Sequence, residues 1–243
     1  MINYSIIIPT LNEEKLLPNL LEVICDQSLL KEYNYEVIIS DGGSSDSTLD
    51  IARKFNAVIV EKKINEKQNI AMGRNAGAKS AKGNVLIFIN GDVYIKNFEV
   101  FLLKIKNKFL PSEFLAMTCK VEVFPHEQKL IDLIFHSFYN FHFHALNVIG
   151  MGMGRGEFQT IRKDVFEKVN GFNEELAAGE DFDLFRRIRK YGKILFARDL
   201  VVYESPRRYR KLGHFRIFFT WLINSVYIIF TKTSKSSEWK EVR

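Results

Sequence analysis

Short β-branched runs alternate with helical patterns along the first third of the chain. The predicted strands are apolar runs stopped by proline, glycine or polar residues, and they span residues 4–10, 35–43, 57–62 and 84–90. The predicted helices have apolar residues at spacings of three and four, capping residues at their start, or many small residues, and they span 14–29, 45–55 and 69–81. Strict alternation with short links predicts parallel strands, right-handed crossovers and a doubly wound α/β sheet flanked by helices.

Polar residues gather where the predicted strands end. Ligands of such sheets bind beyond the carboxyl ends of the strands, so these residues are site candidates. The first strand ends at Pro9, Thr10, Asn12 and Glu13, the second at Asp41, Gly42 and Gly43, and the fourth at Asn90, Gly91 and Asp92.

Ordinary turns are the alternative interpretation of two of these strand ends. The segment SDGGSSDST around Asp41 is rich in helix-capping residues, and Asn90-Gly91 is the dipeptide most typical of a type I′ hairpin. A helical pattern with Val100, Phe101 and Leu103 follows and favours a site over a hairpin, but Val93 to Ile95 leave a short return strand open.

An acidic helix is predicted at residues 176–193. Glu180 and Asp181 lie at its front, its apolar stripe is Leu184, Phe185 and Ile188, and Gly192 ends it. Acidic residues in a first turn also complement the helix macrodipole, so this charge pattern has a purely structural explanation as well.

A basic and apolar segment closes the chain. Residues 215–231 are flanked by Arg207, Arg208, Arg210 and Lys211 before them and by Lys232 and Lys235 after them. The apolar run is at the short limit for a bilayer span and is interrupted by Arg216, Asn224 and Ser225. An interfacial helix on a membrane and a helix packed on the domain or on a partner subunit are both open. Residues 233–243 are polar.

Composition limits the expected domain size, the partners and the cellular compartment of the protein. With 243 residues, 47% of them hydrophobic, the chain can bury the core of one large domain. A net charge of +6 permits but does not require an anionic partner such as a phosphate ligand or a membrane surface, and nucleic acid is the weaker candidate. Cys25 and Cys119 lack a paired spacing, and the first residues lack a secretory signal. We therefore expect a cytoplasmic protein, with a peripheral place at the inner face of the cell membrane left open.

Four segments carry a resemblance to a known family. SIIIPTLNEE, VIISDGGSSDST, GRNAGAKSAKGNVLIFINGDV and GEDFDLFRRIRKYG resemble, in order and spacing, the family 2 glycosyltransferases of the GT-A fold, from about residue 4 to about residue 200. The resemblance implies hexosyl transfer with inversion from a UDP- or GDP-type nucleotide-sugar, with Mn²⁺ or Mg²⁺, to a glycan or lipid-linked acceptor.

The resemblance also implies a division of the chain. Residues 1–205 would form the GT-A domain, with a nucleotide-sugar-binding half at 1–95 and an acceptor-binding half at 96–205, followed by a helical segment and polar tail at 206–243. Two alternatives stay open, a non-catalytic nucleotide- or glycan-binding module and a nucleotidyltransferase. The latter should carry a glycine-rich phosphate loop, which PTLNEEKLLP does not resemble.

Donor contacts are assigned from the strand ends. Asp41 matches the family aspartate that accepts a hydrogen bond from the base, and Thr10 and Glu13 would approach base and ribose. Arg74, in GRNAG, could bind a phosphate with its planar fork, and its neighbours favour this role over the alternative of a solvated helix residue. The remaining candidates on this side are Pro9, Leu11, Gly42, Asn90 and Gly91.

Asp92 is the predicted metal ligand. A cation that holds a diphosphate takes only one or two protein carboxylates, because phosphate oxygens and water fill the other positions. The family commonly has Asp-any-Asp here, whereas this chain has Asn90 in the first place, which weakens a metal role but keeps a ribose role. Glu204 falls where the family often has a ligating histidine, unless it is a surface residue.

Asp181 corresponds to the catalytic base of the family. Glu180 and Arg187 would orient it, and Asp183 on the same turn is the competing base. Acceptor contacts are expected from Glu157 and its neighbours Arg155 and Gln159.

Overall fold

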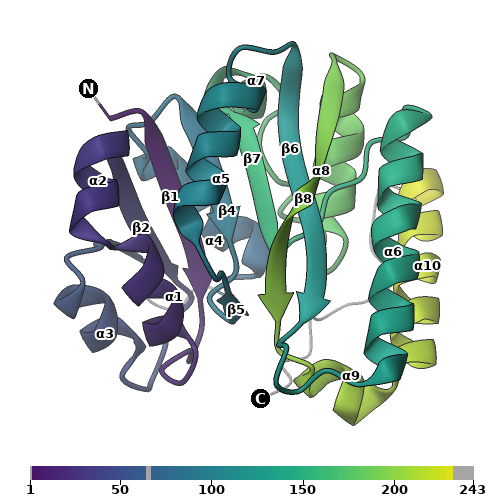
Figure 1. Cartoon of the computed structure of the whole chain (residues 1–243), viewed down its shortest axis with the longest axis horizontal. Coiled ribbons are helices and arrows are strands. Elements are labelled where there is room, and N and C mark those ends of the chain that lie inside the picture. Colours follow the sequence, from purple (N-terminus) through teal and green to yellow (C-terminus); the bar gives the residue numbers. More distant parts are fainter. Residues whose placement is uncertain (1, 64–66, 232–243) are drawn as a thin grey trace.

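The computed structural model describes residues 2–63 and 67–231, and the polar tail predicted at 233–243 lies outside them. The described strands form one eight-stranded sheet in the order β3-β2-β1-β4-β7-β6-β8-β5 (Figure 1). The strands are β1 Tyr4–Thr10, β2 Tyr35–Asp41, β3 Val58–Glu61, β4 Val85–Ile89, β5 Val93–Tyr94, β6 Phe114–Val123, β7 Phe158–Arg162 and β8 Lys193–Glu204. The helices are α1 Leu17–Ile24, α2 Gln27–Tyr33, α3 Thr48–Lys54, α4 Ile70–Ser80, α5 Phe98–Lys104, the π-helix η1 Ile105–Phe109, α6 Leu130–Val148, α7 Lys163–Lys168, α8 Glu180–Arg189, α9 Arg207–Leu212 and α10 His214–Thr231.

The first half of the sheet is parallel, as the alternation of strands and helices predicts. β1 pairs with β2 and β4, and β2 pairs with β3, all in parallel register. Alternate side chains of a strand point to opposite faces, so Ile6 and Ile8 join the core under α1 and α5, whereas Ile7 joins the core under α4 and α8. Helices therefore cover both faces, and the carboxyl ends of β1, β2 and β4 lie along one edge.

The second half departs from the parallel expectation. β7 runs antiparallel to both β4 and β6, while β6 and β8 are parallel to each other. β5 pairs antiparallel with β8, with Val93 opposite Glu204. The Asn90-Gly91 turn therefore does not return the chain onto β4, and the hairpin interpretation is wrong.

The helix predicted over residues 14–29 is two helices. α1 ends at Ile24, and α2 begins after Asp26, whose side chain accepts hydrogen bonds from the backbone N–H groups of Ser28 and Leu29. A capping aspartate in mid-pattern satisfies the first amides of a new helix, so it divides an apolar periodicity that continues through it.

The C-terminal helices pack onto the body of the molecule. Asp132 in the first turn of α6 is buried and accepts hydrogen bonds from Arg210 of α9 and from His214 at the start of α10. α6 and α10 consequently lie side by side with their amino-terminal ends together at α9, next to the carboxyl ends of β6 and β8 (Figure 1). Within the described part of the chain, no helix combines the length and apolar character needed to cross a membrane.

Candidate active site

The loops after β1 and β2 are tied to each other. Thr10 donates a hydrogen bond to Asp41 at 3.0 Å, and Asn12 accepts one from the Ser45 amide at 2.7 Å. Glycine permits this close approach at Gly42, because a Cβ there would lie 3.3 Å from the Thr10 carbonyl oxygen and 3.7 Å from Leu11. The first two strand ends thus form one rigid ledge.

Asp41 has a structural role in this ledge. Its carboxylate is 1% exposed and accepts hydrogen bonds from Thr10, from the amides of Gly43 and Ser44, and from the Ser44 hydroxyl. A carboxylate offers about four acceptor sites, so these partners occupy it fully. In this structure Asp41 stabilises a turn, as the alternative interpretation of this strand end expected. A contact between Asp41 and a nucleobase would require one of these hydrogen bonds to be exchanged.

The third strand end reaches the same ledge. A Cβ on Gly91 would lie 3.3 Å from Thr10, 3.4 Å from Glu13 and 3.6 Å from the Pro9 carbonyl oxygen. The structure thereby brings together the predicted donor-side residues that follow β1 and β4.

Arg74 connects this ledge to the acidic helix. Its guanidinium is 1% exposed and donates to Glu180 at 2.7 Å, to the Asn90 side-chain oxygen at 2.9 Å and to the Gly156 carbonyl oxygen at 2.9 Å. It also lies 5.1 Å from the centre of the Phe172 ring. The expected open phosphate contact differs from this arrangement, in which protein groups hold the guanidinium because a buried charge must be paired.

Asp181 lies beside this guanidinium at the start of α8. Its side chain is partly exposed, and a Cβ built on Gly156 would come within 3.5 Å of its Oδ2. Burial, together with the adjacent Glu180 carboxylate, raises the pKa of Asp181 to about 7 against the opposing effect of Arg74. A carboxylate with this pKa can accept a proton near neutral pH, which is the property required of a general base.

The competing base, Asp183, has a different surrounding. It pairs with Arg187 at 2.8 Å, and Arg187 also donates to the backbone carbonyl oxygens of Val169 and Gly171. Arg187 therefore braces the loop after α7 and contacts Asp183 rather than Asp181, which differs from the orienting role expected of it. Glu180 acts on Asp181 through Arg74 and through its charge.

Asp92 forms an ion pair that the sequence analysis did not predict. Arg207 of α9 contacts the Asp92 carboxylate at 2.7 Å and Glu13 at 3.5 Å. A basic flank of the C-terminal segment thus enters the candidate site. Asn90 accepts a hydrogen bond from Arg74 through its side-chain oxygen. Asp92 is therefore the only carboxylate that residues 88–93 offer at this strand end.

Glu204 belongs to a buried polar cluster. It accepts hydrogen bonds from Tyr209 at 2.7 Å and from Arg155 at 3.2 Å, and Arg155 also pairs with Glu157 at 3.2 Å. Burial, followed by the carboxylates of Glu157 and Asp92, raises the pKa of Glu204 to about 8. Although burial alone would raise the pKa of Glu157, Arg155 lowers it. Gln159, which was expected to contact an acceptor, is fully buried.

The carboxyl groups of Asp92 and Glu204, beside β5 and β8, are the candidates to hold a hard divalent cation. Asp92 precedes Val93, which pairs with Glu204, and the pKa of Glu204 is raised partly by the charge of Asp92. Oxygen ligands of this kind suit Mg²⁺ and Mn²⁺. No set of three or more ligating His, Cys, Asp or Glu side chains occurs in the described residues, so a bound diphosphate would have to complete the coordination.

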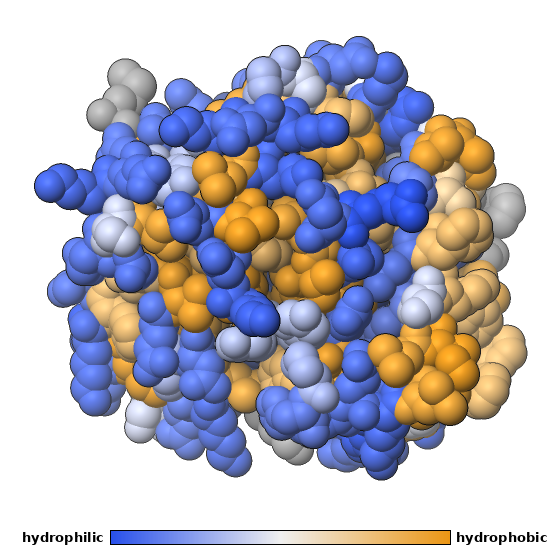
Figure 2. Space-filling model, viewed as in Figure 1, coloured by the Kyte–Doolittle hydropathy of each residue, from blue (hydrophilic) through white to orange (hydrophobic). Residues whose placement is uncertain are grey.

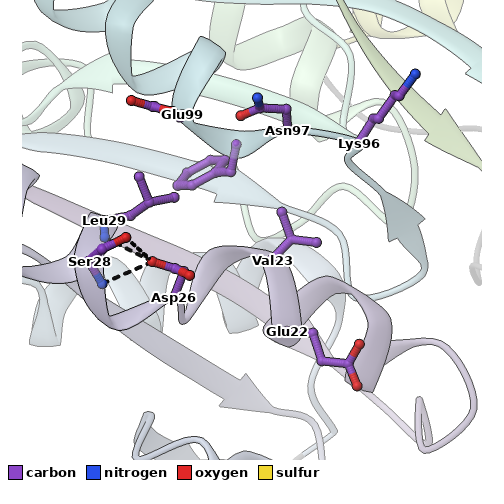
Figure 3. Close-up of a pocket in the computed structure, with 9 residues that line it drawn as sticks. Glu22, Val23, Asp26, Ser28, Leu29, Lys96, Asn97 and Glu99 are labelled. Atoms are coloured by element: carbon purple, nitrogen blue, oxygen red, sulfur yellow. Dashed lines mark hydrogen bonds between the residues drawn. The ribbon is translucent and has the colours of Figure 1, made fainter.

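A separate hollow lies away from these groups. A cavity of about 300 Å³ between the α1–α2 junction and the start of α5 is lined by Val23, Asp26, Leu29, Asn97 and Phe98 among others, and none of the predicted site residues lines it (Figure 3). In Figure 3 Asp26 turns to Ser28 and Leu29, so its carboxylate serves as the cap of α2.

Comparisons with known proteins agree with the fold and the motifs. Residues 5–169 match the family model described as glycosyl transferase family 2. A dolichyl N-acetyl-α-D-glucosaminyl phosphate glucuronosyltransferase of Methanococcus voltae is 40% identical over 94 residues, which cover 37% of this chain and 29% of that protein. The O-antigen chain rhamnosyltransferase of Salmonella typhimurium is 26% identical over 90% of this chain and 74% of its own.

A solved structure shows the same architecture. The mannosyltransferase of Pyrobaculum calidifontis in complex with GDP-Man and Mn²⁺ has a TM-score of 0.68 and 19% identity, covering 89% of this chain and 64% of that one. The architecture is the GT-A fold, as the sequence motifs predicted. The present chain spans less than a third of the Methanococcus relative, so the family rather than any one relative is what the match establishes. With the family model covering more than half of its length, the chain belongs to glycosyl transferase family 2.

Proposed function

We propose that the protein transfers a sugar from a nucleotide-sugar to an acceptor hydroxyl with inversion at the anomeric carbon. The observation that carries this proposal is that the Arg74 guanidinium connects the segment of a base candidate, Asp181, with the segment of a cation candidate, Asp92. Arg74 holds Asn90, two residues before Asp92, and Glu180, the residue before Asp181.

A single displacement fits these groups. The acceptor oxygen attacks the anomeric carbon and forms the new C–O bond while the bond to the diphosphate breaks, and Asp181 takes the acceptor proton. The nucleoside diphosphate leaves with the electron pair of the broken bond. Glu180 keeps the pKa of Asp181 high enough for proton uptake, and Arg74 keeps it from rising further.

The donor and its cation are proposed to bind beside Asp92 and Glu204. Asp92 and Glu204 would hold Mn²⁺ or Mg²⁺, which when bound neutralises charge that develops on the departing diphosphate. Arg207 is a second candidate to neutralise the charge of the departing diphosphate, because it already lies against Asp92 and Glu13. A UDP- or GDP-type donor is proposed, in keeping with the GDP-Man complex of the Pyrobaculum enzyme.

A glycan or lipid-linked saccharide is the proposed acceptor. The name of the Methanococcus relative specifies an acceptor linked to dolichyl phosphate, and that of the Salmonella relative specifies an O-antigen chain. We place the reaction in the cytoplasm, at or near the inner face of the cell membrane. Glu157 and Arg155, beside Glu204, are the proposed support on this side.

Replacing the base should separate catalysis from folding. Asp181→Asn should lower kcat by about 10²–10⁴-fold, the usual contribution of a general base, while donor binding stays normal. Because the pKa of Asp181 is raised in the folded state from 3.8 to about 7, its ionisation opposes folding above pH 7. The variant should therefore unfold at an equal or higher temperature at pH 8. Initial-rate kinetics, donor titration and thermal unfolding check these expectations.

Asp183→Asn is the matched control for that substitution. It removes a carboxylate from the same turn of α8, one that pairs with Arg187, and should leave kcat close to the unmodified value. Full activity in Asp181→Asn with loss in Asp183→Asn would reverse the assignment of the base.

The pH dependence should report the ionisation of Asp181. Below its pKa of about 7 the carboxyl is protonated and cannot take a proton, so kcat at saturating Mn²⁺ should fall about tenfold per pH unit on the acid side. Glu180→Gln removes a neighbouring negative charge and frees Arg74 to act on Asp181, and both effects lower the pKa. The rise in its kcat profile should move to lower pH, and an unmoved or oppositely moved profile would refute the coupling.

Metal dependence is expected to rest on Asp92 rather than on residue 90. Asp92→Ala should lower kcat/KM by about 100-fold or more, the scale seen on removing one group that stabilises transition-state charge. Asn90→Asp should preserve or strengthen Mn²⁺ use, because Arg74 already faces this position.

The measurements are rates across a Mn²⁺ series and calorimetric titration of Mn²⁺ with nucleoside diphosphate present. Asp199→Ala is the control, because this carboxylate is exposed and pairs with Lys104. Unchanged Mn²⁺ dependence in Asp92→Ala would contradict the assignment. Nucleotide binding without any transfer, across a panel of nucleotide-sugars, would favour a binding module.

A further inference from the structure

The outer side of α6 is largely apolar and also carries exposed Ser137 and His142. Its most exposed large apolar residues are Leu130 at 73%, Phe141 at 70% and Val148 at 69%, and Ile134 and Phe138 are more than half exposed. α6 contains no Lys, Arg or Glu, and its one Asp, Asp132, is buried. A surface helix of a water-soluble domain normally presents charged residues on this side.

α10 continues the same surface. Phe215 is 78% exposed and Phe219 55%, with Leu222, Ile223 and Tyr227 also exposed. Ring contacts join the two helices, because Tyr139 of α6 lies 5.4 Å from Trp221 of α10. Figure 2 shows hydrophobic surface at the right-hand side of the molecule, where Figure 1 places α6 and α10. We call the exposed apolar side of α6 and α10 the two-helix face. Exposed apolar patches of this kind mark interaction sites.

Positive charge gathers at one end of the two-helix face. The shared amino-terminal ends of α6 and α10 carry exposed Lys129, Lys211 and Arg216. Apolar surface beside basic side chains complements the acyl region and anionic headgroups of a lipid bilayer. In the described residues neither helix can cross a membrane, so they can contact lipid only by lying along it.

We propose that the two-helix face docks on an anionic lipid surface, with its phenylalanines entering the acyl boundary and the basic residues at the α9 end meeting the headgroups. The occupant is a lipid bilayer rather than a second copy of the chain. Exposed α6 positions offer apolar contact with few polar groups, whereas the rim of a protein interface needs polar partners.

The docked surface is connected to the candidate active site. α9 joins it to the site through Arg207, which contacts Asp92, and through Tyr209, which donates to Glu204. α10 also packs on the residue that precedes the base helix, because a Cβ on Gly179 would lie 2.5 Å from Ile228. A lipid-linked acceptor would then meet the site without leaving the membrane. That consequence rests on the proposed function, but lipid docking does not.

Vesicle flotation of the full chain tests the proposal without donor or metal. The protein should float with phosphatidylcholine vesicles that contain phosphatidylglycerol and less with phosphatidylcholine alone. Phe138→Ser/Phe141→Ser and Phe215→Ser/Phe219→Ser should each weaken binding by roughly tenfold or more, because each removes two large apolar side chains from the acyl boundary. Val100→Ser/Leu103→Ser is the control, since these α5 residues are 46% and 40% exposed outside the two-helix face.

A second variant tests the charge at the α9 end independently of apolar packing. Lys211→Glu/Arg216→Glu should weaken binding to anionic vesicles only, and added salt should weaken the unmodified protein in the same way.

Three results would overturn the proposal. They are no flotation with either vesicle, unchanged flotation of both double-serine variants, and a stable dimer that these variants convert to a monomer without any vesicle binding. Flotation that persists in a protein unable to transfer sugar would refute the proposed reaction and leave lipid docking standing.

Discussion

The site depends on a single buried guanidinium. Arg74 is 1% exposed, and a charge removed from water must be compensated by partners within the protein. Its partners come from the end of β4, from the loop before β7 and from the first turn of α8. Three segments distant in sequence are thereby fixed to α4, and the cation side and the base side of the site keep one relation to each other.

This constraint also explains the charge state of the site. Burial and neighbouring carboxylates raise the pKa values of both Asp181 and Glu204. Such crowding disfavours the ionised forms and so opposes folding at higher pH, a cost that active sites commonly carry. A base needs the first raised pKa, and a cation near Asp92 and Glu204 would relieve the second. Asn90 accepts a hydrogen bond from Arg74 without adding another negative charge to the site. An asparagine in place of the common family aspartate is therefore compatible with the hydrogen bonds of Arg74.

Local pattern predicted the parallel half of the fold and the strand ends that carry the candidate site residues. The strands ending at Thr10, Asp41 and Asn90 were visible because apolar runs stop there, and Asp181 was visible as the front of an amphipathic helix. The break at Asp26 was missed because a cap interrupts a helix without interrupting its periodicity.

Long-range pairing set the remaining features. β5 joins β8, and Arg207 reaches Asp92 across 115 residues of sequence, so neither follows from spacing along the chain. Arg74 was expected to face a phosphate. The sequence shows an arginine near the candidate site, but it does not show which groups that arginine contacts. The glycines and the asparagine next to Arg74 in the sequence were the available signal that it packs closely against other parts of the protein. The exposed apolar side of α6 was not predicted, because its exposure depends on how α6 packs against α10 and the rest of the domain.

The most direct test of this account is a crystal structure of the chain with an intact nucleotide-sugar analogue and Mn²⁺. We predict that Asp92 binds the metal while Arg74 still donates to Asn90 and Glu180, with the Asp181 carboxylate facing the anomeric carbon. A structure in which Arg74 has left these partners to bind the diphosphate, with Asp181 directed away from the sugar, would contradict the account.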